Sequence, residues 1–155
     1  MQTEINFIIS QLKDAYEGDP WFGRNAKELL SEIDEQTAII QFNHQHSILE
    51  LVWHIITWRE FTIDRLLPEK PLAYFEGADW RKLNHTDKTL WPQGLHRLQE
   101  TQQQLIDLLQ KADDKVLDGQ VKERSYNFRK LLHGLIQHDI YHLGQIAFIN
   151  KAVKG

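Results

Sequence analysis

Cysteine is absent from the 155-residue chain. Its absence excludes disulfides and thiolate metal sites, and it leaves His, Asp and Glu as the only side chains for strong metal binding. Proline and glycine are scarce, with 4 and 8 residues respectively, whereas long segments are rich in Leu, Ile, Gln, Glu and Lys. This composition favours an all-helical protein over a strand-rich one.

Concentrated positive charge and long apolar runs are also missing. The formal net charge is -4 and the sequence shows no basic face, which argues against nucleic acid and against an anionic membrane as partners. No apolar run is long enough to span a bilayer, and the first residues lack the basic start and apolar core of a secretory signal. We therefore expect a soluble, cytoplasmic protein.

Apolar residues recur at three-to-four residue spacing in four long segments, which predicts four amphipathic helices. These segments are residues 3–17, 47–67, 89–111 and 127–151. A short helix is predicted over residues 26–33, and the segment 68–87 is long enough to be a crossover rather than a tight turn. The sequence contains no internal repeat, so residues 1–155 are predicted to form one domain, a four-helix bundle with a short extra helix.

The last predicted helix carries two histidines one turn apart, His138 and His142. Both lie on the inward stripe, where a bundle would normally have Leu. At about 1.5 Å rise per residue they are roughly 6 Å apart along the axis, so both rings can converge on one ion. This spacing permits chelation without requiring it, and the alternative is a pair of histidines that are hydrogen-bonded in the core or partly exposed.

A third inward histidine lies on the second long helix. His54 follows Leu51 by three residues and precedes Trp58 by four, which places it on the core side. A set of three histidines leaves coordination positions open, as in catalytic rather than closed structural sites. His54, His138 and His142 are therefore candidate ligands of a divalent metal ion, and imidazoles with at most one carboxylate suit Zn, Ni, Fe or Mn.

Two carboxylates lie next to these histidines in the sequence. Glu50 has three open roles: a fourth ligand, an acceptor for an imidazole N–H, or the capping-box partner of Ser47. Asp139 stands where His-Glu-x-x-His metalloproteases carry their glutamate base. Because Asp is one methylene shorter, we do not expect peptidase activity. We expect Asp139 to orient an imidazole ring or to pair with an arginine.

The remaining histidines are weaker candidates for a site. His96 and His133 fall on outward faces and are expected to be mostly solvated. His44 and His46 precede the second long helix, where they could line the mouth of a site or lie on the surface. Aromatic residues that could form the wall of a pocket are Trp21, Trp58 and Tyr141, although such residues are more often part of a core.

Two segments resemble the DinB-like superfamily: HSILELVWHIITWR at residues 46–59 and LHGLIQHDIYHLGQI at residues 132–146. Trp21-Phe22-Gly23 is similar to a recurrent aromatic connector in one branch of it, and the resemblance covers residues 21–151. Members of that superfamily are four-helix bundles with a divalent metal held by one histidine of the second helix and two of the last. Carried over to this chain, the resemblance implies His54, His138 and His142.

The resemblance also implies classes of function. Relatives include transferases and an isomerase that use low-molecular-weight thiols such as mycothiol or bacillithiol, others are described as metal-dependent hydrolases, and dimers are common. This implies a metal-dependent enzyme acting on a small molecule by thiol-group transfer or hydrolysis, with a low-molecular-weight thiol as co-substrate of the transfer and a homodimeric assembly. The alternative is a non-catalytic metal-binding or interaction protein, which the missing general base favours.

Overall fold

The computed structural model describes residues 3–67 and 79–155. These residues form six α-helices and two short 3-10 helices, and within the described ranges the only strand-like feature is an isolated bridge between Gln120 and Asn127. The all-helical prediction is confirmed. The elements are α1 (Glu4–Glu17), α2 (Ala26–Ser31), α3 (Glu35–Ala38), η1 (Phe42–His44), α4 (Ile48–Leu66), α5 (Leu90–Gln110), η2 (Asp114–Asp118) and α6 (Phe128–Lys154).

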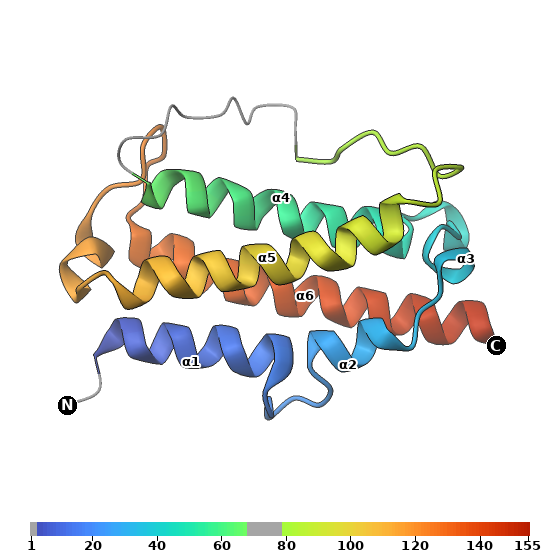
Figure 1. The fold of residues 1–155 in the computed structure, drawn as a ribbon, viewed down its shortest axis with the longest axis horizontal. Coiled ribbons are helices and arrows are strands. Elements are labelled where there is room, and N and C mark those ends of the chain that lie inside the picture. Colours follow the sequence, from blue (N-terminus) through green and yellow to red (C-terminus); the bar gives the residue numbers. More distant parts are fainter. Residues whose placement is uncertain (1–2, 68–78) are drawn as a thin grey trace.

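The four long helices form a bundle in which α4 packs against α5 and α6, and α1 packs against the same two. Figure 1 shows that α4 and α5 run in the same direction, while α1 and α6 run in the opposite one. Two consecutive parallel helices need a connection that returns along the bundle. The parallel directions of α4 and α5 agree with the crossover predicted over residues 68–87, of which residues 68–78 lie outside the described part of the chain.

Side chains at the helix starts explain why the predicted boundaries hold. Most helices begin directly after a residue whose side-chain oxygen accepts a hydrogen bond from a backbone N–H of the first turn. These residues are Thr3, Asn25, Asp34, Ser47 and Asn127. Pro92 lies in the first turn of α5. Backbone N–H groups of a first turn have no acceptor within the helix, so the N–H that proline lacks costs α5 no hydrogen bond. The four-residue helix α3 is too short to show a periodic pattern and was not predicted.

The centre of the bundle contains polar groups that the helical pattern did not predict. Thr101 and Gln102 belong to a polar stretch of α5, yet both are buried. The Gln102 amide donates to the carbonyl of Leu12 at 3.0 Å, and its oxygen accepts from Arg59 Nη1 at 2.8 Å. Gln102 is therefore a bridge between α1 and α4, because a buried amide is tolerated only where its hydrogen bonds are made.

A buried ion pair joins α4 to α6 next to that bridge. Arg59 donates from Nε and Nη2 to Asp139 Oδ2, at 2.9 and 2.8 Å, and both side chains are about 4% exposed. The expectation that Asp139 pairs with an arginine is confirmed. This pair fixes the position of α6 beside His138, the residue that precedes Asp139 in the chain.

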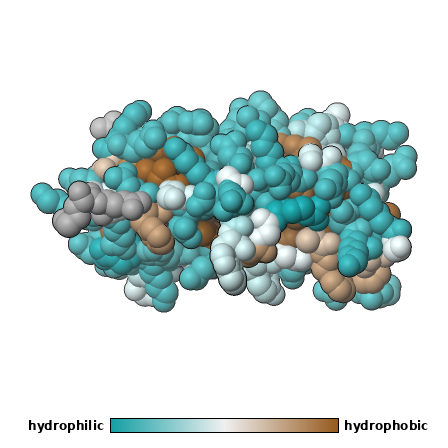
Figure 2. Space-filling view, turned by 90° about the horizontal axis from the view of Figure 1, so that it is seen from below, coloured by the Kyte–Doolittle hydropathy of each residue, from teal (hydrophilic) through white to brown (hydrophobic). Residues whose placement is uncertain are grey.

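The outer surface is mainly hydrophilic on the side of α1 and α2. Figure 2 shows this face covered by hydrophilic residues with separate apolar patches between them. Of the helices in the described ranges, none has the length and apolar character needed to cross a membrane.

Candidate metal centre

The structure brings the three predicted histidines together at one point between α4 and α6. Nε2 of His138 lies 3.0 Å from Nε2 of His54 and 3.1 Å from Nε2 of His142. One ligand atom from each ring falls within 4.8 Å of the other two. Among the described residues, this is the one group of three or more His, Asp or Glu with such geometry.

The spacing of the three rings fits a metal ion. With metal-nitrogen bonds of about 2.0 to 2.1 Å, two nitrogens of a tetrahedral site lie roughly 3.3 Å apart. The observed separations around His138 Nε2 are a few tenths of an ångström shorter, so small outward shifts of the rings would admit an ion. His54 and His142 are buried and His138 is half-buried, which limits competition from water.

Acceptors behind two of the rings determine which nitrogen carries the proton. His54 Nδ1 donates to the backbone carbonyl of Asp79 at 2.8 Å, and His142 Nδ1 donates to Gln145 Oε1 at 2.6 Å. With the proton on Nδ1, the lone pair of Nε2 points into the cluster in both rings. Such acceptors orient the imidazoles of metal sites, and lone pairs converging on one point favour a cation there.

The third ring has no such partner at hydrogen-bond distance. Within residues 3–67 and 79–155, His138 Nδ1 and Asp139 Oδ1 are both buried without a hydrogen-bond partner, and they lie 3.7 Å apart. That separation is too long for a hydrogen bond. Asp139 is therefore held by Arg59.

Two of the three rings, those of His54 and His142, are held in the neutral form that binds metals. The pKa of His142 is lowered to about 4, chiefly by burial and to a smaller extent by the neighbouring rings of His138 and His54, while the hydrogen bond to Gln145 opposes the shift. Burial also lowers the pKa of His54, although its hydrogen bond to Asp79 opposes the shift. At neutral pH both rings are unprotonated at the nitrogen that a metal requires.

Trp80, from the crossover, completes the wall of the site. Its ring lies parallel to the ring of His54 at 3.8 Å and, on its other face, parallel to the ring of His46 at 3.6 Å. Asp79, the preceding residue, also accepts a hydrogen bond from Trp58 Nε1 at 2.8 Å. Residues 79 and 80 were not predicted as site residues, because a crossover without periodicity does not indicate which side chains turn inward.

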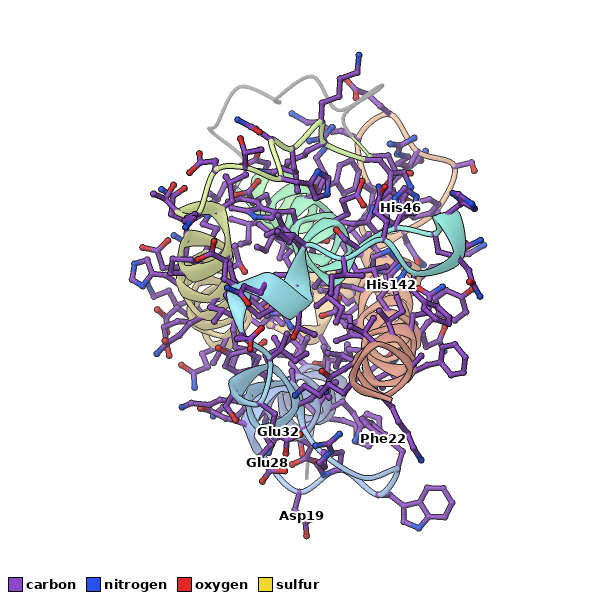
Figure 3. The ribbon with its side chains drawn as sticks, turned by 90° about the vertical axis from the view of Figure 1, so that its right-hand side faces the viewer. Asp19, Phe22, Glu28, Glu32, His46 and His142 are labelled. Carbon is purple, nitrogen blue, oxygen red and sulfur yellow. The ribbon has the colours of Figure 1, made fainter. Side chains whose placement is uncertain are left out.

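A pocket of about 720 Å³ opens beside His142. Its wall combines η1, the start of α4, Trp80 and the second half of α6. The lining residues are Phe42, Asn43, Gln45, His46, Leu51, Trp80, Tyr141, His142, Gly144, Gln145, Phe148 and Ile149. Figure 3 shows His46 above His142, on different segments of the chain, and both line this pocket. Of the two placements left open for His44 and His46, both residues lie on the surface, and His46 also lines this pocket.

A smaller hollow of about 220 Å³ lies along the first half of α6. Its lining includes His138 and Trp58, together with Tyr126 and Lys130. The histidine cluster therefore contributes one ligand candidate to each of two depressions, His142 to the larger and His138 to the smaller.

Of the three roles considered for Glu50, which were metal ligand, acceptor for an imidazole N–H and capping-box partner of Ser47, the structure shows the last. Its Oε2 accepts from the backbone N–H of Ser47 at 2.7 Å, while the Ser47 hydroxyl accepts from the N–H of Glu50, so the capping box is complete. Burial raises the pKa of Glu50, but the Ser47 hydrogen bonds outweigh this effect and leave it lowered. Its other oxygen lies 3.5 Å from His46 Nδ1, outside the three-histidine cluster.

Replacing Glu50 by Ala is expected to lower the free energy of unfolding by about 1 kcal/mol, because one half of the capping box is lost. Metal content is expected to stay at the wild-type level. Urea unfolding and elemental analysis measure the two effects. Thr89→Ala is the control, since Thr89 precedes α5 without making a capping hydrogen bond. If Glu50→Ala loses its metal, Glu50 is a metal ligand and the capping assignment is incomplete.

The aromatic connector does not reach the site. Trp21 is fully exposed and Phe22 is 48% exposed. Figure 3 places Phe22 at the lower edge of the molecule, away from His46 and His142. The prediction that Trp21 walls the pocket is wrong, because the short loop between α1 and α2 turns outward at the opposite side of the bundle. Trp58 and Tyr141 do line depressions beside the cluster.

The outward histidines of α5 and α6 differ. The side chain of His96 is 73% exposed, as expected. That of His133 is 37% exposed and lies 3.3 Å from Glu4 Oε1, so it is less solvated than predicted. Neither belongs to the cluster.

Comparison with known proteins supports the reading of the fold and of the cluster. A family model described as the DinB superfamily matches residues 22–146. This range includes α4 and all three clustered histidines. No curated protein matches the chain. No solved structure matches it either.

Proposed function

Because the chain belongs to the DinB superfamily and holds three imidazoles at one point, we propose that it is a divalent-metal-dependent enzyme acting on a small molecule. The reaction is thiol-group transfer or hydrolysis. The observation that carries the proposal is the convergence of His54, His138 and His142 beside a pocket that His142 also lines.

In this proposal, different residues of the site have different roles. His54, His138 and His142 would hold a divalent ion, and that ion would act as a Lewis acid able to lower the pKa of a water or a thiol. The Asp79 carbonyl and Gln145 keep two of the rings oriented. Trp80 covers one face of His54 and limits access of water from that side.

Turnover of simple electrophiles tests the proposal. The probes are 4-nitrophenyl acetate with water alone, and 1-chloro-2,4-dinitrobenzene with cysteine, glutathione, mycothiol or bacillithiol. In the second reaction the thiolate sulfur bonds to the ring carbon and chloride leaves. We expect metal-dependent turnover of one class, reduced at least about 100-fold in His54→Ala because the ion is lost.

His96→Ala is the matched control, since His96 is an exposed histidine far from the cluster. It is expected to keep wild-type turnover. Thiol-dependent turnover assigns the protein to the transferases, and turnover in water alone assigns it to the hydrolases. Metal-loaded protein that turns over neither probe would contradict the proposal and favour the non-catalytic alternative, a metal-binding or interaction protein of the same fold.

A further inference from the structure

The pocket beside His142 differs from the rest of the surface in having no fixed charge. None of its lining residues, all of them within the described ranges, is Lys, Arg, Asp or Glu. The polar side chains of its lining carry amides, imidazoles, one hydroxyl and one indole N–H, and they are Asn43, Gln45, Gln145, His46, His142, Tyr141 and Trp80. By contrast, the smaller hollow beside His138 carries Lys130.

Aromatic rings form much of the wall of this pocket. Tyr141 and Phe148 lie on α6 on either side of His142 along the chain, and they are 65% and 67% exposed. Phe148 meets Phe42 edge to face at 6.4 Å, and Tyr141 meets His142 edge to face at 5.1 Å. Edge-to-face contacts leave ring surface uncovered, and large exposed aromatic side chains around a pocket are typical of ligand sites.

Trp80 is less available for stacking than these two residues. Both faces of its indole are already covered, one by His46 and the other by His54. A flat ligand in the pocket would therefore stack against Tyr141 or Phe148. It would meet the edge of Trp80 and lie beside His142.

From these observations we propose that the pocket binds an uncharged aromatic small molecule with its donor group directed at the histidine cluster. The proposal rests on the proposed function, because the donor group is the part that the ion would hold. An aromatic ring matches the walls, and amides can bond neutral polar substituents. A charged group on the part of the ligand away from the ion would lose hydration without gaining an ion-pair partner from the lining residues, which disfavours it.

Affinities of matched hydroxamic acids test this proposal on the zinc-loaded protein. Acetohydroxamic acid carries the metal-binding group alone, and benzohydroxamic acid adds a phenyl ring to the same group. We expect benzohydroxamic acid to bind at least about tenfold more tightly, because the ring is removed from water. The 4-methyl derivative is expected to bind more tightly than the 4-carboxy derivative. Isothermal titration calorimetry measures each dissociation constant.

Phe148→Ala is expected to reduce the benzohydroxamic-to-acetohydroxamic ratio below about threefold and to leave the affinity for acetohydroxamic acid unchanged. Phe7→Ala is the control, since Phe7 is 49% exposed on α1. Equal affinities of the two acids in wild-type protein would overturn the proposal. A Phe148→Ala protein with altered oligomeric mass and unaltered affinities would also overturn it. In that case the exposed rings of Tyr141 and Phe148 would be contacts with a second copy of the chain.

If the chain does not bind a metal ion at the histidine cluster, the titrations give a result that differs from failure of the aromatic pocket. Adding zinc to metal-free protein then does not strengthen the binding of either hydroxamic acid. The pocket is then tested with 2-naphthol, an uncharged aromatic without a chelating group. Binding that weakens in Phe148→Ala and is retained in Phe7→Ala supports the aromatic pocket, whereas absence of binding overturns it.

Discussion

Replacing Arg59 by Met is expected to lower the free energy of unfolding by about 3 to 5 kcal/mol, the largest single-residue effect on stability that we expect. The substitution removes both hydrogen bonds to Asp139 Oδ2 and the one to Gln102. The carboxylate of Asp139 would then be a buried charge without a partner, and the Gln102 bridge to α1 would lose one of its contacts. Urea unfolding of metal-free protein measures the loss.

Two further variants separate the ion pair from simple loss of packing. Arg97→Met should cost at most about 1 kcal/mol, because Arg97 is partly exposed. Glu60 also keeps its contact with Arg81 in that variant. In the double variant Arg59→Met with Asp139→Leu, a large part of the lost stability should return, since no charge is left buried. If Arg59→Met unfolds at the wild-type urea concentration, the pair does not hold α4 to α6.

Adding zinc to metal-free protein is expected to raise Tm by roughly 10 °C when free zinc exceeds the Kd by about 1,000-fold. The folded chain presents the three nitrogens together, while the unfolded chain does not, so binding stabilises the folded state. In metal-free protein the converging lone pairs of the rings have no cation to face. Thermal unfolding followed by circular dichroism, with and without zinc, measures the shift.

The same titration with His142→Ala should give a Tm shift close to zero, because one ligand is lost. His96→Ala should respond as the wild type does, which excludes zinc binding to any exposed histidine as the cause. A full shift in His142→Ala would contradict the assignment of that residue, even if the protein binds zinc elsewhere.

The periodic parts of the fold were predictable from the sequence and the irregular parts were not. Residues spaced for one face of a helix predicted α1, α4, α5 and α6 to within a few residues of their bounds. Burial of Gln102 was not predictable, because its partners Arg59 and Leu12 belong to helices distant in the sequence. Helical spacing places a residue on a face, but it does not say which polar side chains find partners across the bundle.

The same division applies to the site. His54, His138 and His142 occupy inward positions of regular helices, so periodicity alone indicated that they could meet. Trp80 and the carbonyl of Asp79 come from the crossover, where neither spacing nor capping predicts a direction. Trp21 lies in a loop too, and neither of the roles considered for it, pocket wall or core, is found, because its side chain is fully exposed.

Elemental analysis of untagged protein tests the central claim, that these three histidines form a metal site, most directly. The account predicts close to one divalent ion per wild-type chain, almost none in His138→Ala, and wild-type content in His96→Ala. Wild-type protein without stoichiometric metal, or His138→Ala protein with a full complement, would contradict it.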